Sequence, residues 1–266
     1  MDKVRALLLA SWRAARSYRV QLTMSVAALG LSIVPYWYAS NAMQPLMADK
    51  IRGEGSQYFG FLVVGMMVFS ILTVAVNAMP SAISTGISNG SLEALLATKV
   101  RAPALLLGLT AFDLSWSLFK GLVVISMGAL LGARFAWGNA LSAVPIFALI
   151  VASYLPFGLL AASCVLAFRT PGPLPQIVQV VSALLGGVYF PTAVIPSLAQ
   201  HVSAVVPLTY GLRALRSVLL NGSSLAAVGP DLAVLAAMTA GLYALSSLAF
   251  MAAMRHVKRG GGLSQY

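Results

Sequence analysis

Prolines interrupt the apolar stretch between residues 186 and 222, and this constrains the fold more than any other feature of the chain. Pro191, Pro196 and Pro207 divide the stretch, and two arginines follow in its second half. Proline removes a backbone donor, and its ring breaks an α-helix. At membrane depth, non-helical backbone persists only where protein or water satisfies its polar groups. We therefore predict a folded-back segment of short helices here, not a simple spanning helix.

The rest of the chain is strongly apolar. Hydrophobic residues make up 59% of the 266 residues and charged residues only 9%, whereas a soluble domain carries roughly 25% charged residues. Several apolar runs reach the roughly 20 residues that a helix needs to cross the hydrocarbon core. We predict an all-α integral membrane protein with a single domain over residues 1–266 and a re-entrant segment at 188–230. The six expected transmembrane helices lie near residues 20–40, 58–83, 106–131, 141–167, 174–190 and 232–254.

The first 19 residues combine basic and apolar side chains. Val4, Leu8 and Trp12 recur every four residues and share one helical face, while three of the arginines lie largely away from it. Such a helix suits the membrane surface, with its basic side toward lipid phosphates. The alternative is a basic tail that only sets the topology. We favour an interfacial helix over residues 1–19 that contacts membrane lipid.

Basic residues are distributed unequally between the two sides of the predicted spans. A cytoplasmic N-terminus makes both termini cytoplasmic and places 11 basic residues inside and 5 outside, the asymmetry typical of bacterial membrane proteins. This accounts for the net charge of +11, and no basic segment interleaved with aromatics indicates nucleic-acid binding. We predict a multi-pass protein of the plasma (inner) membrane of a prokaryote. The inside set is Lys3, Arg5, Arg13, Arg16, Arg19, Lys99, Arg101, Arg169, Arg255, Lys258 and Arg259, and the outside set is Lys50, Arg52, Arg134, Arg213 and Arg216.

Residues 88–103, between the second and third expected spans, carry the signals of a short helix. Capping residues and an acidic residue stand at its start, and two basic residues and a proline stand at its end, the polarity that the helix dipole favours. Leu92, Leu95 and Leu96 share a face. That face fits either a groove on a partner protein or the membrane surface.

In this order and spacing, the two segments resemble those of the type-2 permeases of ATP-binding-cassette (ABC) exporters. The loop of that family typically reads Glu-x-Gly-Thr-Leu-Glu-x-Leu-Leu-x-Thr-Pro, and the resemblance covers essentially the whole chain. It implies that residues 88–103 form a coupling helix that docks in a cleft of a separate ATPase subunit. The implied coupling residues are Gly90, Ser91, Leu92, Glu93, Leu95, Leu96, Thr98, Lys99 and Arg101.

Two positions of this loop depart from the family pattern. The earlier acidic residue of the family falls at Ser88, and its proline falls at Lys99. These differences change the charge of the expected ATPase contact. They are compatible with a permease that pairs with a non-identical second permease.

The resemblance also implies that the proline-rich segment closes the outer leaflet and shapes an exit. Tyr210 suits the headgroup level, and Arg213 and Arg216 share a helical face. The two arginines either reach outer-leaflet phosphates as interfacial anchors or line the exit and contact substrate. The residues expected in this region are Gly186, Gly187, Phe190, Pro191, Pro196, Pro207, Tyr210, Arg213 and Arg216.

Asp113 and Lys120 lie in or beside the third expected span. Seven residues make two helical turns, about 10 Å of rise, so the two side chains share a face without having to touch. Charges within a membrane are costly and usually face protein or a wet cavity. The pair either lines a translocation path, or bonds to a second permease subunit, or has only a structural role at the interface.

The sequence contains no pattern typical of a catalytic, metal-binding or nucleotide-binding site. Cys164 is the only cysteine, His201 and His256 lack metal-ligand spacing, and the Gly-x-x-x-x-Gly-Lys-[Ser/Thr] phosphate loop is missing. We predict no metal site, no catalytic residue and no cofactor bound by this chain. ATP and Mg are expected in a partner ATPase subunit.

The leading interpretation is the permease subunit of an ATP-driven exporter. It pairs with a second permease, as a homodimer or heterodimer, and with ABC ATPase subunits. Its substrate is expected to be an amphipathic or hydrophobic molecule, such as a drug, lipid, glycolipid, polysaccharide or peptide. Two alternatives belong to other classes: an ion-coupled secondary transporter that uses Asp113 and Lys120 as a relay, and a non-transporting membrane scaffold. The lack of internal repeats with matching broken helices counts against the secondary transporter.

Overall fold

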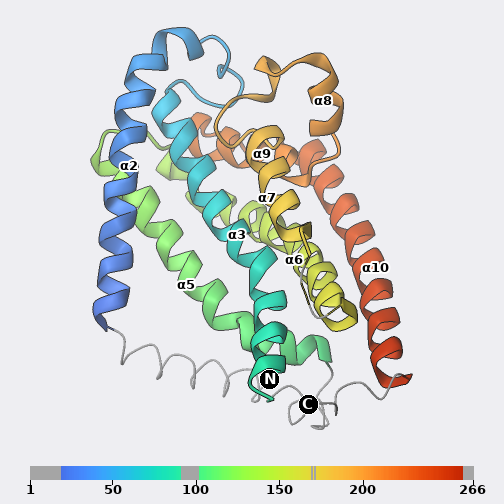
Figure 1. The fold of residues 1–266 in the computed structure, drawn as a ribbon. Coiled ribbons are helices and arrows are strands. Elements are labelled where there is room, and N and C mark those ends of the chain that lie inside the picture. The colour runs from blue at the N-terminus through green and yellow to red at the C-terminus, as the bar shows by residue number, and fades with distance from the viewer. Residues whose placement is uncertain (1–18, 91–101, 169, 171, 260–266) are drawn as a thin grey trace.

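The computed structural model describes residues 19–90, 102–168, 170 and 172–259, and this part of the chain is helical without strands. The predicted interfacial helix and most of the predicted coupling segment lie outside these residues. The all-α prediction is confirmed for the described part. The helices are α2 (Arg19–Met47), α3 (Tyr58–Ser88), α5 (Ala102–Leu130), α6 (Ala140–Phe168), α7 (Leu174–Leu185), α8 (Ser197–Ser203), α9 (Pro207–Asn221) and α10 (Gly229–Arg259) (Figure 1).

Four stretches of the described residues are long and apolar enough to cross a membrane: Tyr58–Ser88, Thr110–Leu130, Trp137–Phe168 and Gly229–Arg255. α2 is not among them, although its 29 residues correspond to about 43 Å of helix. The fifth expected span, 174–190, is wrong as a single helix. α7 has 12 residues, about 18 Å, which is too short for a hydrocarbon core of about 30 Å. The six-span topology therefore stays a prediction.

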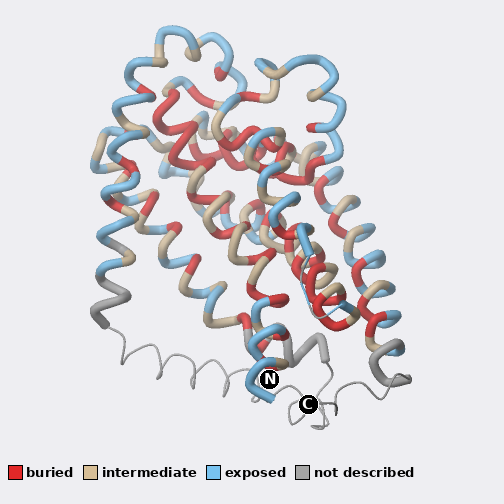
Figure 2. The backbone as a smooth tube through the Cα atoms, viewed as in Figure 1, coloured by how far each residue is buried: buried red, intermediate tan, exposed pale blue. Residues whose placement is uncertain are grey.

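α3 is the central helix of the bundle. Its sequence is apolar on nearly all sides, so that it is stable only when other helices surround it. It packs against α2, α5, α6, α7 and α9, and α10 packs on the far side of α6. Buried residues concentrate along α3 and on the faces turned toward it (Figure 2). Few residues of α5 and α10 are buried along their spans, and both helices lie at the edge of the bundle.

The two ends of the bundle differ. We call the end with the loops 48–57 and 131–139 and with α8 the outer end, and the end where α3 stops and α5 begins the inner end (Figure 1). The helix breaks predicted from the prolines are confirmed: α8 begins directly after Pro196, and α9 begins at Pro207. Pro191 has extended backbone. As a result, several short elements occupy the region between α7 and α10.

Candidate functional site

Hydroxyl groups satisfy the backbone where α7 stops. The chain turns after Leu185, and Gly187 has a φ of 79°, a left-handed conformation that favours glycine. The Leu185 carbonyl accepts a hydrogen bond of 2.6 Å from Ser203 Oγ, and Thr209 Oγ1 donates to the Ser203 carbonyl at 2.8 Å. The backbone at the end of α7 therefore gains the polar partners that buried backbone groups need.

Arg216 on α9 is the centre of this polar region. Its side chain is 1% exposed. Nη1 donates to the Gly187 carbonyl at 2.8 Å, and Nη2 donates to the Val188 carbonyl at 3.0 Å. Nε and Nη2 donate to the Phe61 carbonyl on α3 at 3.2 and 3.1 Å, and the Phe61 ring lies under the guanidinium, 3.4 Å from its carbon.

The remaining donation from Arg216 goes to an acidic side chain of the outer loop. Nη1 lies 3.0 Å from Glu54 Oε2. These bonds use the five N–H groups of the guanidinium. Burial lowers the pKa of Arg216 to about 10, and the Glu54 carboxylate opposes this decrease. The arginine therefore stays charged at neutral pH. It joins α9, α3, the break after α7 and the outer loop, which are far apart in sequence.

Gly65 of α3 is required by the same region. A Cβ at this position would lie 2.3 Å from the Val188 carbonyl oxygen and 2.7 Å from Arg216 Nη2. Both distances are shorter than the contacts that a Cβ atom makes in proteins. Glycine at position 65 therefore allows the backbone at Val188 to lie against α3. Sequence reasoning missed Gly65 and Glu54, because neither belongs to a local motif.

Arg213 differs from Arg216 although only three residues separate them on α9. Its side chain is 44% exposed and pairs with Asp231 at the start of α10, and the hydrogen bond to Asp231 raises the pKa of Arg213. The hypothesis that both arginines reach lipid phosphates is wrong for Arg216, because its donors are all used inside the protein. The Tyr210 hydroxyl donates a hydrogen bond to the Ala204 carbonyl at 3.0 Å.

The other predicted residues of this region separate into two groups. Gly186, Gly187, Pro191 and Pro207 are buried around the break, whereas Phe190 and Pro196 lie on the exposed outer loop. The structure therefore brings Gly187 to Arg216. It does not bring all nine predicted positions to one surface.

A second polar region lies between α3 and α5, toward the inner end. We call this cavity of about 280 Å³ the polar furrow. It is open on one side, and Asp113 is exposed and Lys120 half-buried at its edge. The structure therefore brings Asp113 and Lys120 to one cavity. Its lining residues are Thr73, Val74, Asn77, Ala78, Ser81, Asp113, Trp116, Ser117 and Lys120.

The polar groups of the furrow are only partly used by the protein. Thr73 Oγ1 and Ser117 Oγ donate to carbonyls of their own helices at 2.9 Å, and Asn77 Nδ2 donates to the Thr73 carbonyl at 2.7 Å. The three ion pairs among the described residues include neither Asp113 nor Lys120. Two opposite charges therefore face the same cavity without forming an ion pair.

A stripe of polar residues extends the furrow along α3. Apart from the adjacent Ser84 and Thr85, its members recur every three or four residues, which places them on one helical face. Ser81, Ser84, Thr85 and Ser88 are exposed in the structure. This regular spacing is the signal that sequence reasoning overlooked on α3. The stripe consists of Ser70, Thr73, Asn77, Ser81, Ser84, Thr85 and Ser88.

Comparison with known proteins gives the family. A sequence model described as ABC-2 type transporter matches residues 4–220, which include the polar furrow, the break after α7 and Arg216. The chain belongs to the ABC-2 type transporter family. It is thus a membrane component of a transporter, as the two sequence segments predicted.

Two relatives of this ABC-2 chain carry the name Nodulation protein J. The protein of Bradyrhizobium diazoefficiens is 26% identical over 171 residues, 64% of this chain and 65% of the relative, just under two thirds of its length. The protein of Rhizobium meliloti is 25% identical over 225 residues, 83% of this chain and 84% of the relative.

The expected coupling residues of this ABC-2 chain lie almost entirely outside the described part. α3 ends at Ser88, and Gly90 follows with a φ of 65°. Ser91, Leu92, Glu93, Leu95, Leu96, Thr98, Lys99 and Arg101 are not described. Among the described residues, no group of three or more His, Cys, Asp or Glu side chains could hold a metal ion.

Proposed function

We propose that this chain is the permease subunit of an ATP-driven exporter that moves an amphipathic or hydrophobic substrate out of the cytoplasm. Membership of the ABC-2 type transporter family supports the transport role. The polar furrow supports the assignment of a pathway, because an open polar cavity within apolar spans is expensive unless water or substrate occupies it.

The proposed orientation places the inner end in the cytoplasm. The support comes from the excess of basic residues in the segments assigned to that end. Both termini are then cytoplasmic, and the protein lies in the inner membrane of a prokaryote with six spans. In this orientation the polar furrow opens toward the cytoplasm, and the Arg216 region closes the external half.

The proposed pathway runs between two permease subunits, identical or not. Thr73, Asn77 and Ser81 of α3 offer neutral hydrogen-bonding groups, while Asp113 and Lys120 of α5 offer one charge of each sign. This set suits the polar part of an amphipathic molecule. The membrane-facing apolar surface of α5 suits the remainder of such a substrate.

Energy is proposed to come from ABC ATPase subunits that bind ATP and Mg beneath the bundle. The segment 88–103 links α3 to α5, the two helices that line the furrow. A displacement of this segment by a closing ATPase would therefore act directly on both walls of the furrow. Leu92 and Leu95 are the proposed contacts with the ATPase cleft.

The test is purification of the chain in mild detergent from its native membrane, with co-purifying proteins identified by mass spectrometry. Recovery of an ABC ATPase with the wild-type chain is expected, and its loss with Leu92→Asp and Leu95→Asp. The matched control is Leu198→Asp on α8, which is 84% exposed at the outer end and should keep the ATPase.

Recovery of the folded chain without any ATPase would contradict the proposal. An ion-coupled transporter would then be the better account, with transport driven by a gradient and independent of ATP. An ATPase that stays bound to the Leu92→Asp, Leu95→Asp variant would leave the exporter assignment but remove the proposed coupling contact. A scaffold would show co-purifying proteins but no ATP-dependent efflux.

A further inference from the structure

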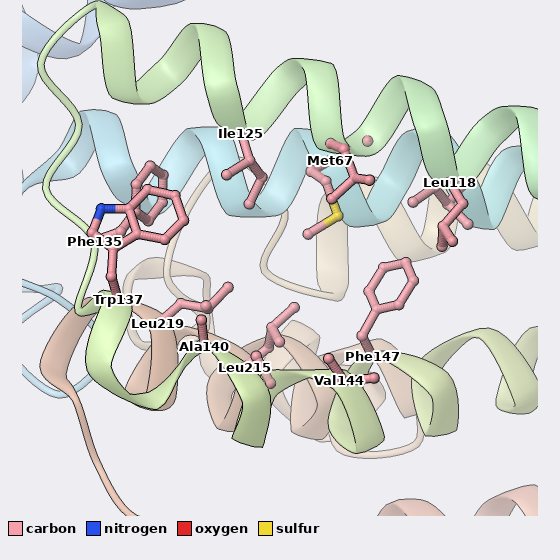
Figure 3. Close-up of a pocket in the computed structure, with 14 residues that line it drawn as sticks. Met67, Leu118, Ile125, Phe135, Trp137, Ala140, Val144, Phe147, Leu215 and Leu219 are labelled. Carbon is pink, nitrogen blue, oxygen red and sulfur yellow. The ribbon is translucent and has the colours of Figure 1, made fainter.

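A second cavity lies on the other side of α5, between α5 and α6. We call this cavity of about 270 Å³ the lateral groove. α3 and α9 form its floor, and Figure 3 shows apolar side chains converging on it from all four helices. The indole nitrogen of Trp137 is the only polar side-chain atom in the lining. The lateral groove is therefore apolar, whereas the polar furrow is lined in part by hydrogen-bonding and charged side chains.

The dimensions of the groove fit one leaflet of a membrane. Its α5 wall runs from Leu118 to Ile125, a rise of about 10 Å, whereas half of a hydrocarbon core of about 30 Å is about 15 Å. Trp137 closes the outer end (Figure 3), and tryptophan is enriched at the level of the headgroups. The groove is thus a feature of the leaflet at the outer end and does not form a path across the membrane.

The mouth of the groove is open in the bundle. Leu122 is 63% exposed and Val144 is 61% exposed, and both line the groove. α5 packs mainly against α3, whereas α6 packs against both α10 and α3, and neither of the two helices packs closely on the other. Within a membrane, such a mouth faces acyl chains. If the groove were empty, the side chains of its walls would lose the van der Waals contacts that an acyl chain can supply.

A cation stands beside the outer end of the groove. Arg134 belongs to the short connection between α5 and α6, one residue before Phe135, which lines the groove. Gln57 Oε1 holds this connection by accepting the Arg134 backbone N–H at 3.0 Å. The Arg134 side chain is exposed and takes part in none of the three ion pairs found among the described residues.

We propose that the lateral groove binds one acyl chain of a membrane phospholipid whose phosphate pairs with Arg134. The groove supplies an apolar surface of single-leaflet depth, and the arginine supplies the charge complementary to the phosphate. Trp137, at the outer end of the groove, would then lie at the boundary of acyl chain and headgroup. The site is separate from the polar furrow, and its existence does not depend on the transported substrate.

The experiment uses the full chain in vesicles of phosphatidylethanolamine and phosphatidylglycerol that contain a phosphatidylglycerol with a photoreactive diazirine in one acyl chain. Crosslinked peptides are located by mass spectrometry. For the wild type, crosslinks are expected in residues 118–125 and 140–147. Val144→Trp should abolish them by filling the groove. The matched control is Leu141→Trp, because Leu141 is 87% exposed on α6 but does not line the groove.

A second pair of variants tests the phosphate contact. Arg134→Gln should lower the crosslinking by about tenfold, the effect of losing one charge-assisted hydrogen bond. Arg52→Gln is the control, because Arg52 is an exposed arginine of the outer end that already pairs with Asp49. Equal losses in the two variants would overturn the role of Arg134.

Two further results would overturn the acyl-chain site. Crosslinks that remain unchanged in Val144→Trp would show ordinary contact with bulk lipid. Absence of crosslinks in the wild type, together with a disulfide-linked dimer of Leu122→Cys in a Cys164→Ala background, would show that a second copy of the chain covers the groove. Because the readout is lipid contact and not transport, failure here leaves the exporter proposal intact.

Discussion

The Arg216 region and the polar furrow are both polar and both lie among apolar helices, but they use their polar groups differently. The five donors of Arg216 are occupied by three carbonyls and Glu54. In the furrow, Asp113 and Lys120 face one cavity without an ion pair between them. A fully paired polar group supports the fold, whereas an open one is available to water or to a passing molecule.

The largest effect on stability is expected for Arg216→Ala. This change leaves the Gly187, Val188 and Phe61 carbonyls without their donor and Glu54 without its cation. Removing one partner of a buried pair costs about 3–5 kcal/mol. We expect a strong decrease in the amount of folded protein in the membrane and in its unfolding temperature in detergent. Wild-type stability of Arg216→Ala would refute the structural role of this arginine.

Gly65→Ala tests the same region through sterics alone. The added methyl group would overlap the Val188 carbonyl, which lies 2.3 Å from the Cβ position. Overpacking of this kind costs about 1–3 kcal/mol, so the unfolding temperature should fall, but less than in Arg216→Ala. Gly53→Ala is the matched control, because a Cβ there meets no atom within 4 Å. A similar small change in both variants would contradict the predicted close approach.

Arg213→Ala should have a much smaller effect than the change three residues later. Its salt bridge with Asp231 is 44% exposed on the arginine side, and exposed ion pairs contribute roughly 0–1 kcal/mol. The measurement is again the unfolding temperature in detergent. If Arg213→Ala lowered the unfolding temperature as much as Arg216→Ala, the distinction between the buried Arg216 and the exposed Arg213 would be refuted.

The polar furrow should show the opposite behaviour, with little effect on stability and a clear effect on transport. Asp113→Asn and Lys120→Met remove charges that no described residue pairs, so the unfolding temperature should stay near the wild-type value. ATP-dependent release of a fluorescent amphipathic dye should fall by about tenfold, the loss of one interaction with a charged group. Normal release by both variants at equal membrane levels would remove any transport role of the pair.

The sequence predicted the helix breaks because their cause is local. Pro196 and Pro207 stand directly before or at the start of a short helix, and proline acts on its own backbone. Asp113 and Lys120 were also recognised, because a charge in an apolar span is visible without a structure. Their shared face followed from helical spacing alone.

The role of Arg216 required the structure. Its acidic partner Glu54 lies 162 residues away, and three of its acceptors are backbone carbonyls, which carry no signature in the side-chain sequence. The 12-residue α7 was missed as well, because an apolar run of 17 residues conceals the turn at Gly187. The α3 wall of the furrow could have been predicted from the sequence, because Thr73, Asn77 and Ser81 are four residues apart and therefore share one helical face.

The most direct test of the account is whether water enters the polar furrow in the intact membrane. In a Cys164→Ala background, Asn77→Cys places a thiol in the furrow and Leu122→Cys places one on the lipid-exposed side of α5, where burial in lipid keeps a thiol protonated and unreactive. Both variants are treated with a membrane-impermeant maleimide from the inner end, in inside-out vesicles. The account predicts labelling of Asn77→Cys and none of Leu122→Cys. No labelling of Asn77→Cys in a folded protein would contradict a water-filled furrow.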